Sequence, residues 1–231
     1  MTSLPRRIGL AAALAGALCS CSSTGWLRPS APHYLSRGQL QTERVAPPPA
    51  PGSAADQADL AALRDWQARR TAAECARAAS EARATYEEIF GKLSPFPQPL
   101  PEAAAKLFLR VHTEADVAVS WEKDRFQRPR PFKRDPALQP CLGKIGGLAY
   151  PSGHATIARL FALILADLQP QRRQEFLARA NEAAEDRVIG GVHHPSDIEA
   201  GKRLGAALYA RFRESPAFDA DLEALRRLLP R

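Results

Sequence analysis

The sequence lacks several features that mark other classes of protein. No block of lysines and arginines interleaved with aromatic residues is present, so a nucleic-acid partner is not expected, although the net charge is +7. No stretch beyond the N-terminal region offers the roughly 20 apolar residues that a membrane-spanning helix needs. No metal-ligand cluster, internal repeat or strand-like alternation is visible. These absences favour a helical domain with an anionic substrate or surface as its partner.

The N-terminal region has the pattern of a secretory signal. Arg6 and Arg7 precede a short apolar run that is too short for a mature membrane anchor. The sequence Leu18-Cys19-Ser20-Cys21 is similar to the cleavage signal of bacterial lipoproteins, whose last cysteine carries the lipid. We therefore expect residues 1–20 to be a signal peptide and Cys21 to be lipidated. Plain cleavage after a small residue is the alternative.

Residues 21–55 are expected to form a tether. This segment is rich in proline, has few large apolar residues and shows neither a helical nor a strand period. It would hold a folded domain away from a lipid anchor, although a disordered leader with no role would look the same. The folded domain is expected to begin near Asp56 and to cover residues 56–231.

Cysteines are few, and only Cys75 and Cys141 lie beyond the signal region. An even pair in an oxidising compartment can form a disulfide. Two buried thiols would have the same spacing, so the sequence leaves both possibilities open.

The domain is expected to be an all-α helical bundle. Its helices are predicted from apolar periodicity and from start and stop signals over residues 59–90, 101–123, 155–169, 171–185, 196–212 and 217–229. Ser196 and Glu199 have the spacing of a capping box, with Ser196 as the cap. Gly201 and Gly205 lie one turn apart and suit close packing against another helix.

The segment Pro151-Ser152-Gly153-His154 stands directly before the most apolar run of the domain. Proline and serine suit a helix start, and glycine lets the backbone approach a ligand. The first N–H groups of a helix have no intrahelical partner and lie at the positive end of its dipole, which favours an oxyanion. The apolar run predicts a central helix that supports Ser152 and His154 rigidly.

Charged and polar residues recur at fixed spacing in three irregular segments: Lys123 with Arg130-Pro131 seven residues on, then Pro151-Ser152-Gly153-His154, then Arg187 with His193 six on and Asp197 four further. This pattern resembles the tripartite signature of the type 2 phosphatidic acid phosphatase (PAP2) superfamily. In detail it is similar to the soluble class A bacterial acid phosphatases and their envelope relatives. The resemblance covers about residues 101–208.

The resemblance implies a phosphoryl-transfer site. His193 would be the nucleophile, His154 the acid that protonates the leaving alcohol, and Asp197 the carboxylate that orients His193. The phosphate would lie in a cradle of cations and hydrogen-bond donors formed by Lys123, Arg130, Ser152, Gly153 and Arg187. The chemistry of the family needs no metal, so we expect no cofactor and no metal site.

One position departs from the family pattern. Asp186 stands where the family usually has a serine, directly before the arginine of the third segment. An acid that faced the cradle would repel phosphate, so Asp186 either faces away or alters the cradle. The sequence assigns no role to His112 or His194.

The expected function is a metal-independent acid phosphatase that hydrolyses phosphomonoesters through a phosphohistidine. The expected location is the periplasmic side of the bacterial envelope, with a lipid anchor in the outer membrane. The substrate would be a phosphorylated small molecule or lipid. Three alternatives stay open: a lipid phosphate or diphosphate phosphatase, a vanadium-dependent haloperoxidase with the same cradle, and a non-catalytic lipoprotein that binds an anion. The oligomeric state is open, a homo-oligomer included.

Overall fold

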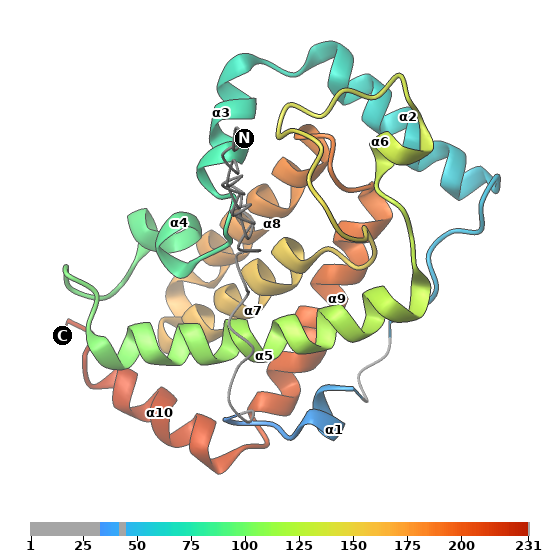
Figure 1. Ribbon diagram of the computed structural model, residues 1–231. Helices are drawn as coiled ribbons and strands as arrows, with labels where there is room; N and C mark the ends of the chain where they lie inside the picture. The colour runs from blue at the N-terminus through green and yellow to red at the C-terminus, as the bar shows by residue number, and fades with distance from the viewer. Residues whose placement is uncertain (1–32, 42–44, 231) are drawn as a thin grey trace, which may run out of the picture. The chain divides into compact units, whose positions relative to one another are not determined.

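A computed structural model describes residues 33–41 and 45–230 of the chain, and its helices are labelled in Figure 1. The α-helices are α1 (Arg37–Leu40), α2 (Ala54–Arg69), α3 (Ala72–Ser80), α4 (Tyr86–Phe90), α5 (Glu102–Phe126), α6 (Pro131–Arg134), α7 (Gly153–Leu168), α8 (Arg173–Ile189), α9 (Pro195–Phe212) and α10 (Pro216–Arg226). Short 3₁₀ helices cover Gly91–Leu93 and Pro170–Arg172. No strand occurs in the described residues, and the predicted all-α fold is confirmed.

Helix α7 lies at the centre of the bundle, as its apolar sequence predicts. It packs most extensively against α8 and α9, and α5 crosses it on another side (Figure 1). Leu160, Phe161 and Ile164 are almost completely buried within it. The helix that carries His154 is therefore held from several directions, and its position is rigidly defined.

Helix α9 lies unusually close to the first turns of α7. A Cβ atom on Gly201 would stand 2.4 Å from the carbonyl oxygen of Ser152, and one on Gly205 would stand 2.4 Å from that of Thr156. Only glycine permits this approach, so the predicted close packing is confirmed. The contact brings the start of α9, with Asp197, next to Ser152.

The single helix predicted over residues 59–90 is wrong, because the chain forms α2, α3 and α4 there. Thr71 begins α3 with a capping box, in which its side chain accepts from the N–H of Glu74 and Glu74 reaches back to the N–H of Thr71. Thr85 caps α4, and Ala84 before it has a φ of 54°. The alanine content of the segment concealed both helix starts, although Thr71 and Glu74 have capping-box spacing.

Part of the expected tether belongs to the packed domain. The carboxylate of Glu114, buried on α5, accepts the backbone N–H groups of residues 33–35 at 2.7, 2.8 and 2.9 Å. Apolar side chains of this segment are buried in the core: Tyr34, Leu35, Leu40 and Val45. The packed domain therefore begins before Asp56, and the predicted boundary between residues 55 and 56 is wrong.

Cys75 and Cys141 form a disulfide, which settles the choice that the sequence left open. It joins α3 to the loop between α6 and α7. The signal peptide predicted over residues 1–20 and the lipidation predicted at Cys21 lie outside the described residues. Within the described part of the chain, no helix combines the length and the apolar character needed to cross a membrane.

Candidate active site

The three segments singled out in the sequence meet at the N-terminal end of α7. Arg130, directly before α6, donates from Nη1 to Nε2 of His193 at 2.7 Å and to the carbonyl oxygen of Val192 at 3.0 Å. The backbone N–H of Ser152 donates to the carbonyl oxygen of Asp197 at 2.9 Å. The bonds of Arg130 join the segment of Lys123 and Arg130 to the segment of His193. The bond of Ser152 joins the segment of His154 to the same segment.

The tautomer of His193 follows from its two neighbours. A guanidinium can only donate, so Nε2 accepts from Arg130 and the ring proton lies on Nδ1, which faces Oδ2 of Asp197 at 3.4 Å. Burial holds the pKa of His193 well below its usual range, although Asp197 acts in the opposite direction. The ring is therefore neutral and keeps a lone pair on Nε2, as a nucleophile requires.

Asp197 is completely buried and accepts hydrogen bonds on both oxygens. Oδ1 accepts from Nη1 of Arg128 at 2.6 Å, and Oδ2 accepts from the backbone N–H of His194 at 2.7 Å and from its Nδ1 at 2.9 Å. Burial alone would raise the pKa of Asp197, but hydrogen bonds from His193 and His194 hold it well below its usual range. Asp197 is therefore a fixed anion behind His193.

The start of α9 differs from the prediction. The cap is His194, two residues before the predicted cap Ser196, and Asp197 rather than Glu199 reaches back to the cap N–H. Ser196, predicted as the cap, lies inside the first turn, where its N–H donates to Asp59 at 3.0 Å. The predicted box was wrong because the carboxylate of Asp197 takes the capping bond.

His194, to which the sequence assigned no role, is completely buried and bonded through both ring nitrogens. Nε2 accepts from Nη1 of Arg134 at 3.1 Å, which leaves the ring proton on Nδ1, the nitrogen that faces Asp197. His194 thus lies behind the carboxylate and does not line the cradle.

Arg187 and Arg130 carry buried donors that no described residue satisfies. Nε and Nη1 of Arg187 and Nε of Arg130 have no hydrogen-bond partner among the described residues. Burial lowers the pKa of each arginine to about 10, and the charge of Arg130 adds to the effect at Arg187. Such donors are costly to bury unpaired, and an oxyanion would satisfy them. Arg187 lies in the last turn of α8, not in the irregular segment that was predicted.

Lys123 comes from the last turn of α5 and donates from Nζ to the carbonyl oxygen of Leu148. Burial, followed by the positive charge of Arg130, lowers its pKa to about 7. Lys123 is therefore a cation in acid and loses its charge close to neutral pH, unlike the two arginines.

The start of α7 supplies His154 and the donors of its first turn. Oγ of Ser152 caps the helix by accepting from the N–H of Ala155 at 3.3 Å, and Gly153 is the first helical residue. Nε2 of His154 bonds the carbonyl oxygen of Glu81 at 2.9 Å, so Nε2 is protonated and Nδ1 is the nitrogen left for a ligand. Burial and the charge of Arg187 lower the pKa of His154 to about 3.

Asp186 faces away from the cradle. Its Oδ1 accepts from Nη2 of Arg77 at 2.7 Å and its Oδ2 accepts from Nε of the same arginine at 2.9 Å. Arg77 belongs to α3, outside the three segments that form the cradle. The acid that replaces the family serine is therefore bound to an arginine of its own.

Sequence reasoning missed Arg128, Asp56 and Asp59. Arg128 is buried, bonds Asp197, and donates from Nη2 to Oδ2 of Asp59 at 2.8 Å. The two aspartates lie three residues apart on α2 and therefore share a face, which is the one signal that the sequence offered. Nothing in the sequence separated Arg128 from an ordinary surface arginine.

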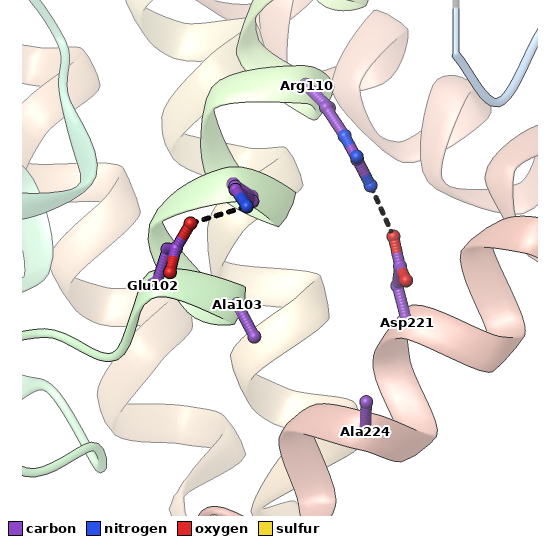
Figure 2. A pocket seen from close by; sticks show the side chains of 6 residues that line it. Glu102, Ala103, Arg110, Asp221 and Ala224 are labelled. Atoms are coloured by element: carbon purple, nitrogen blue, oxygen red, sulfur yellow. Dashed lines mark hydrogen bonds and ion pairs between the residues drawn. The ribbon is translucent and has the colours of Figure 1, made fainter.

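A groove between α5 and α10 lies apart from these residues. Figure 2 shows that Arg110 reaches Asp221 across it. The Arg110–Asp221 pair has a distance of 2.8 Å, and Lys106 pairs with Glu102 at 2.5 Å. Ala103 and Ala224 complete its described lining. Because its cations are paired with carboxylates, this groove differs from the cradle.

The chain is similar in sequence to known proteins. The family model described as the PAP2 superfamily matches residues 103–216. The chain is similar to the non-specific acid phosphatase of Salmonella typhimurium, with 32% identity over 194 residues that cover 79% of this chain and 77% of the relative. It is also similar to the lipid A 1-phosphatase of Rhizobium johnstonii, with 41% identity over 70 residues, 30% of this chain and 29% of the relative.

The fold is similar to that of a solved bacterial vanadium-dependent iodoperoxidase. The TM-score is 0.57 at 18% identity, over 78% of this chain and 53% of the other. At this identity the likeness concerns the fold alone. The sequence match along most of an acid phosphatase, the family model and the shared fold together establish that this chain belongs to the PAP2 superfamily.

Proposed function

We propose that this chain hydrolyses phosphate monoesters through a phosphohistidine on His193. The observation that carries the proposal is the lone pair on Nε2 of His193, 2.7 Å from Arg130, whose Nε is buried without a described partner. A nucleophilic atom therefore stands beside buried cationic donors that an oxyanion would satisfy. The similarity to non-specific acid phosphatases supports a phosphomonoester as that anion.

In the first step, the lone pair of His193 Nε2 attacks phosphorus and the bond from phosphorus to the leaving oxygen breaks. His154 gives its Nδ1 proton to that oxygen, while its Nε2–H stays on the carbonyl of Glu81. The phosphorylated ring keeps its Nδ1 proton, and the fixed charge of Asp197 balances the positive charge that develops there. Arg130, Arg187 and Lys123 would stabilise the equatorial oxygens, with Ser152 and Gly153 adding donors from the start of α7.

In the second step, water attacks the phosphorus of the phosphohistidine. The now neutral His154 takes a proton from this water, the N–P bond breaks, and its electron pair returns to Nε2 of His193. The products are the alcohol and inorganic phosphate, and both histidines regain their initial protonation. Apart from the substrate and this water, the proposed sequence uses only groups of the chain and needs no metal ion.

The proposed mechanism requires His154 to be protonated when substrate is bound. Burial and Arg187 lower its pKa to about 3, and a phosphate dianion in the cradle would act in the opposite direction. Lys123 loses its charge as the pH rises through about 7. We therefore expect hydrolysis to be greatest at roughly pH 5 to 7 and to fall on the alkaline side.

The substrate class has two candidates. The acid phosphatase relative favours small phosphomonoesters, and it matches most of the chain. The lipid A 1-phosphatase relative favours a lipid phosphate, but it matches a much shorter segment. We propose small phosphomonoesters as the main substrates. The pairing of Asp186 with Arg77 argues against the non-catalytic alternative, which depended on an acid that faces the cradle.

We propose further that the protein acts on the periplasmic side of the bacterial envelope, with a signal peptide over residues 1–20 and a lipid on Cys21. The pattern Leu18-Cys19-Ser20-Cys21 supports this proposal. Cys21→Ser should release the protein from the membrane fraction or block its maturation. An unchanged distribution between membrane and soluble fractions would contradict the lipid anchor.

A substrate panel tests the proposed activity. Purified protein should release phosphate from p-nitrophenyl phosphate and nucleotides faster than from lipid phosphates or diphosphates, with inhibition by vanadate and no loss to metal chelators. His193→Ala should abolish turnover, whereas His33→Ala, which changes an exposed histidine, should not. Activity that survives His193→Ala, or that disappears with a chelator, would contradict the mechanism. Halide oxidation supported by vanadate would favour the haloperoxidase alternative.

A further inference from the structure

A chain of buried charges connects α2 to the carboxylate behind the nucleophile. Oδ2 of Asp59 accepts from Nη2 of Arg128 at 2.8 Å, and Nη1 of Arg128 donates to Oδ1 of Asp197 at 2.6 Å. All three side chains are buried, with exposed fractions of 6%, 5% and 0%. Arg128 thus uses its two terminal nitrogens to hold carboxylates on different helices.

A second chain runs in parallel and ends on the other oxygen of Asp197. Oδ2 of Asp56 accepts from Nη2 of Arg134 at 2.7 Å, and Nη1 of Arg134 donates to Nε2 of His194 at 3.1 Å. His194 then donates from Nδ1 to Oδ2 of Asp197 at 2.9 Å. Rotation of the Asp197 carboxylate would break hydrogen bonds at both of its oxygens.

We propose that Arg128, held by Asp59, is a positioning residue that fixes Asp197 and through it the ring of His193. This inference rests on the proposed function, in which His193 attacks the phosphate. Oδ2 of Asp197 lies 3.4 Å from Nδ1 of His193 and is shared with His194. A contact of this length depends on the orientation of the carboxylate, and Arg128 sets that orientation from the opposite oxygen.

The carboxylates of α2 that hold Arg128 and Arg134 lie outside the sequence signature. Asp56 and Asp59 lie before residues 103–216, the part that the family model matches. Burying several charges costs free energy, and such pairs seldom stabilise a fold more than apolar packing would. Because this cluster ends on the carboxylate of Asp197, its role is to hold that carboxylate in position behind His193.

The charged groups around His193 determine the expected effect of replacing Arg128. The ring faces Asp197 of α9, Arg130 before α6 and Lys123 of α5, and Asp197 in turn faces Arg128 and His194. Arg128→Lys keeps the positive charge, but a single ammonium lacks the planar fork that holds both Asp59 and Asp197. The variant therefore tests geometry with little change in net charge.

Steady-state kinetics with p-nitrophenyl phosphate gives the first test. Arg128→Lys should lower kcat by about 100-fold and leave KM nearly unchanged, because Arg128 does not touch the substrate. Asp59→Asn should lower kcat by a smaller factor, since Arg128 remains but loses a charged partner. Arg64→Met is the matched control, because Arg64 of α2 pairs with Asp135 at 2.7 Å and does not reach Asp197. The control should keep the kcat of the wild type.

A readout that does not need turnover separates this inference from the proposed function. The ¹⁵N spectrum of the His193 ring should show the Nδ1-protonated tautomer in the wild type and a mixture of tautomers in Arg128→Lys. If the wild type hydrolyses no ester but the ring signals change in this way, the proposed function fails and the positioning role stands. Unchanged kcat and ring signals in Arg128→Lys would overturn the positioning role. Equal losses of kcat in Arg128→Lys and Arg64→Met would overturn it as well.

Discussion

Arg128 and Arg130 are two residues apart, are both buried, and have opposite electrostatic surroundings. Arg128 binds Asp59 and Asp197 at 2.8 and 2.6 Å, and although burial opposes it, Asp197 and Asp59 raise its pKa. Arg130 binds backbone carbonyls and His193, keeps Nε without a described partner, and has a pKa lowered by burial to about 10.

This difference distinguishes an arginine that holds the structure from one that awaits a ligand. A guanidinium between carboxylates is already neutralised, and an added anion would be repelled by them. Burial of a guanidinium with unpaired donors costs desolvation free energy that no hydrogen bond offsets, so binding an oxyanion is favourable. Arg187 has buried donors without a described partner, so like Arg130 it is expected to bind an anion. Arg134 is paired with Asp56, so like Arg128 it holds the structure.

The largest expected effect concerns the paired arginine. Arg128→Met should lower the free energy of unfolding by about 3–5 kcal/mol, because it leaves buried carboxylates unpaired. Urea denaturation followed by circular dichroism measures this change. A loss no greater than that of Arg64→Met would show that Arg128 is not the centre of a paired cluster.

Arg187→Met should lower activity strongly without lowering the stability of the fold. We expect kcat/KM to fall by about 10²–10³-fold, in the range found for removal of a single transition-state donor. The free energy of unfolding should not fall, since the variant removes a buried charge with unsatisfied donors. Inorganic phosphate at about 100 times its Kd should stabilise the wild type by about 2.7 kcal/mol and the variant much less. Equal stabilisation of both proteins would place the anion elsewhere.

The next effect comes from the cation that titrates near neutral pH. Burial lowers the pKa of Lys123 to about 7, so the charge that helps to hold phosphate is present below this pH and is lost above it. Lys123→Arg keeps the charge, and its ratio of kcat/KM at pH 9 to that at pH 6 should exceed the wild-type ratio by about tenfold or more. Lys92→Arg, a change outside the site, should leave the profile unaltered. Identical profiles for Lys123→Arg and wild type would assign the alkaline limb to another group.

The smallest effect is expected at Asp186. Asp186→Ser restores the usual family residue and should leave the inhibition constant of inorganic phosphate unchanged, because the carboxylate is bound to Arg77. The free energy of unfolding should fall by only about 1 kcal/mol, since Arg77 is 39% exposed and can bind water instead. A clear change in phosphate affinity would show that Asp186 acts on the cradle.

The sequence predicted the fold class, the central helix and the close packing at Gly201 and Gly205, because each of these follows from a local pattern. It failed on helix boundaries where alanine-rich composition concealed caps, as at Thr71. It also failed on the N-terminal boundary, because the segment around Tyr34 is held by a buried glutamate 80 residues away, a contact with no local signal.

The sequence also predicted one part of the candidate site and missed another. The cradle residues, His154, His193 and Asp197 have fixed spacing, and the structure brings them to one end of α7. The supports of Asp197 have no such spacing. Arg128 and Arg134 bond Asp59 and Asp56 of α2, and His194 bonds Arg134, only through the tertiary fold. A contact between Arg128 and Asp59, 69 residues apart, cannot be read from either segment alone.

The most direct test of the account is to trap the covalent intermediate. Enzyme mixed with ³²P-labelled substrate and quenched should be digested under alkaline conditions, which preserve phosphohistidine, and the peptides identified by mass spectrometry. We predict acid-labile phosphate on His193, with no label in His193→Ala and reduced steady-state labelling in Arg187→Met. Phosphate on a serine or on His154, or turnover with no labelled protein at any time, would contradict the central claim that Nε2 of His193 is the nucleophile.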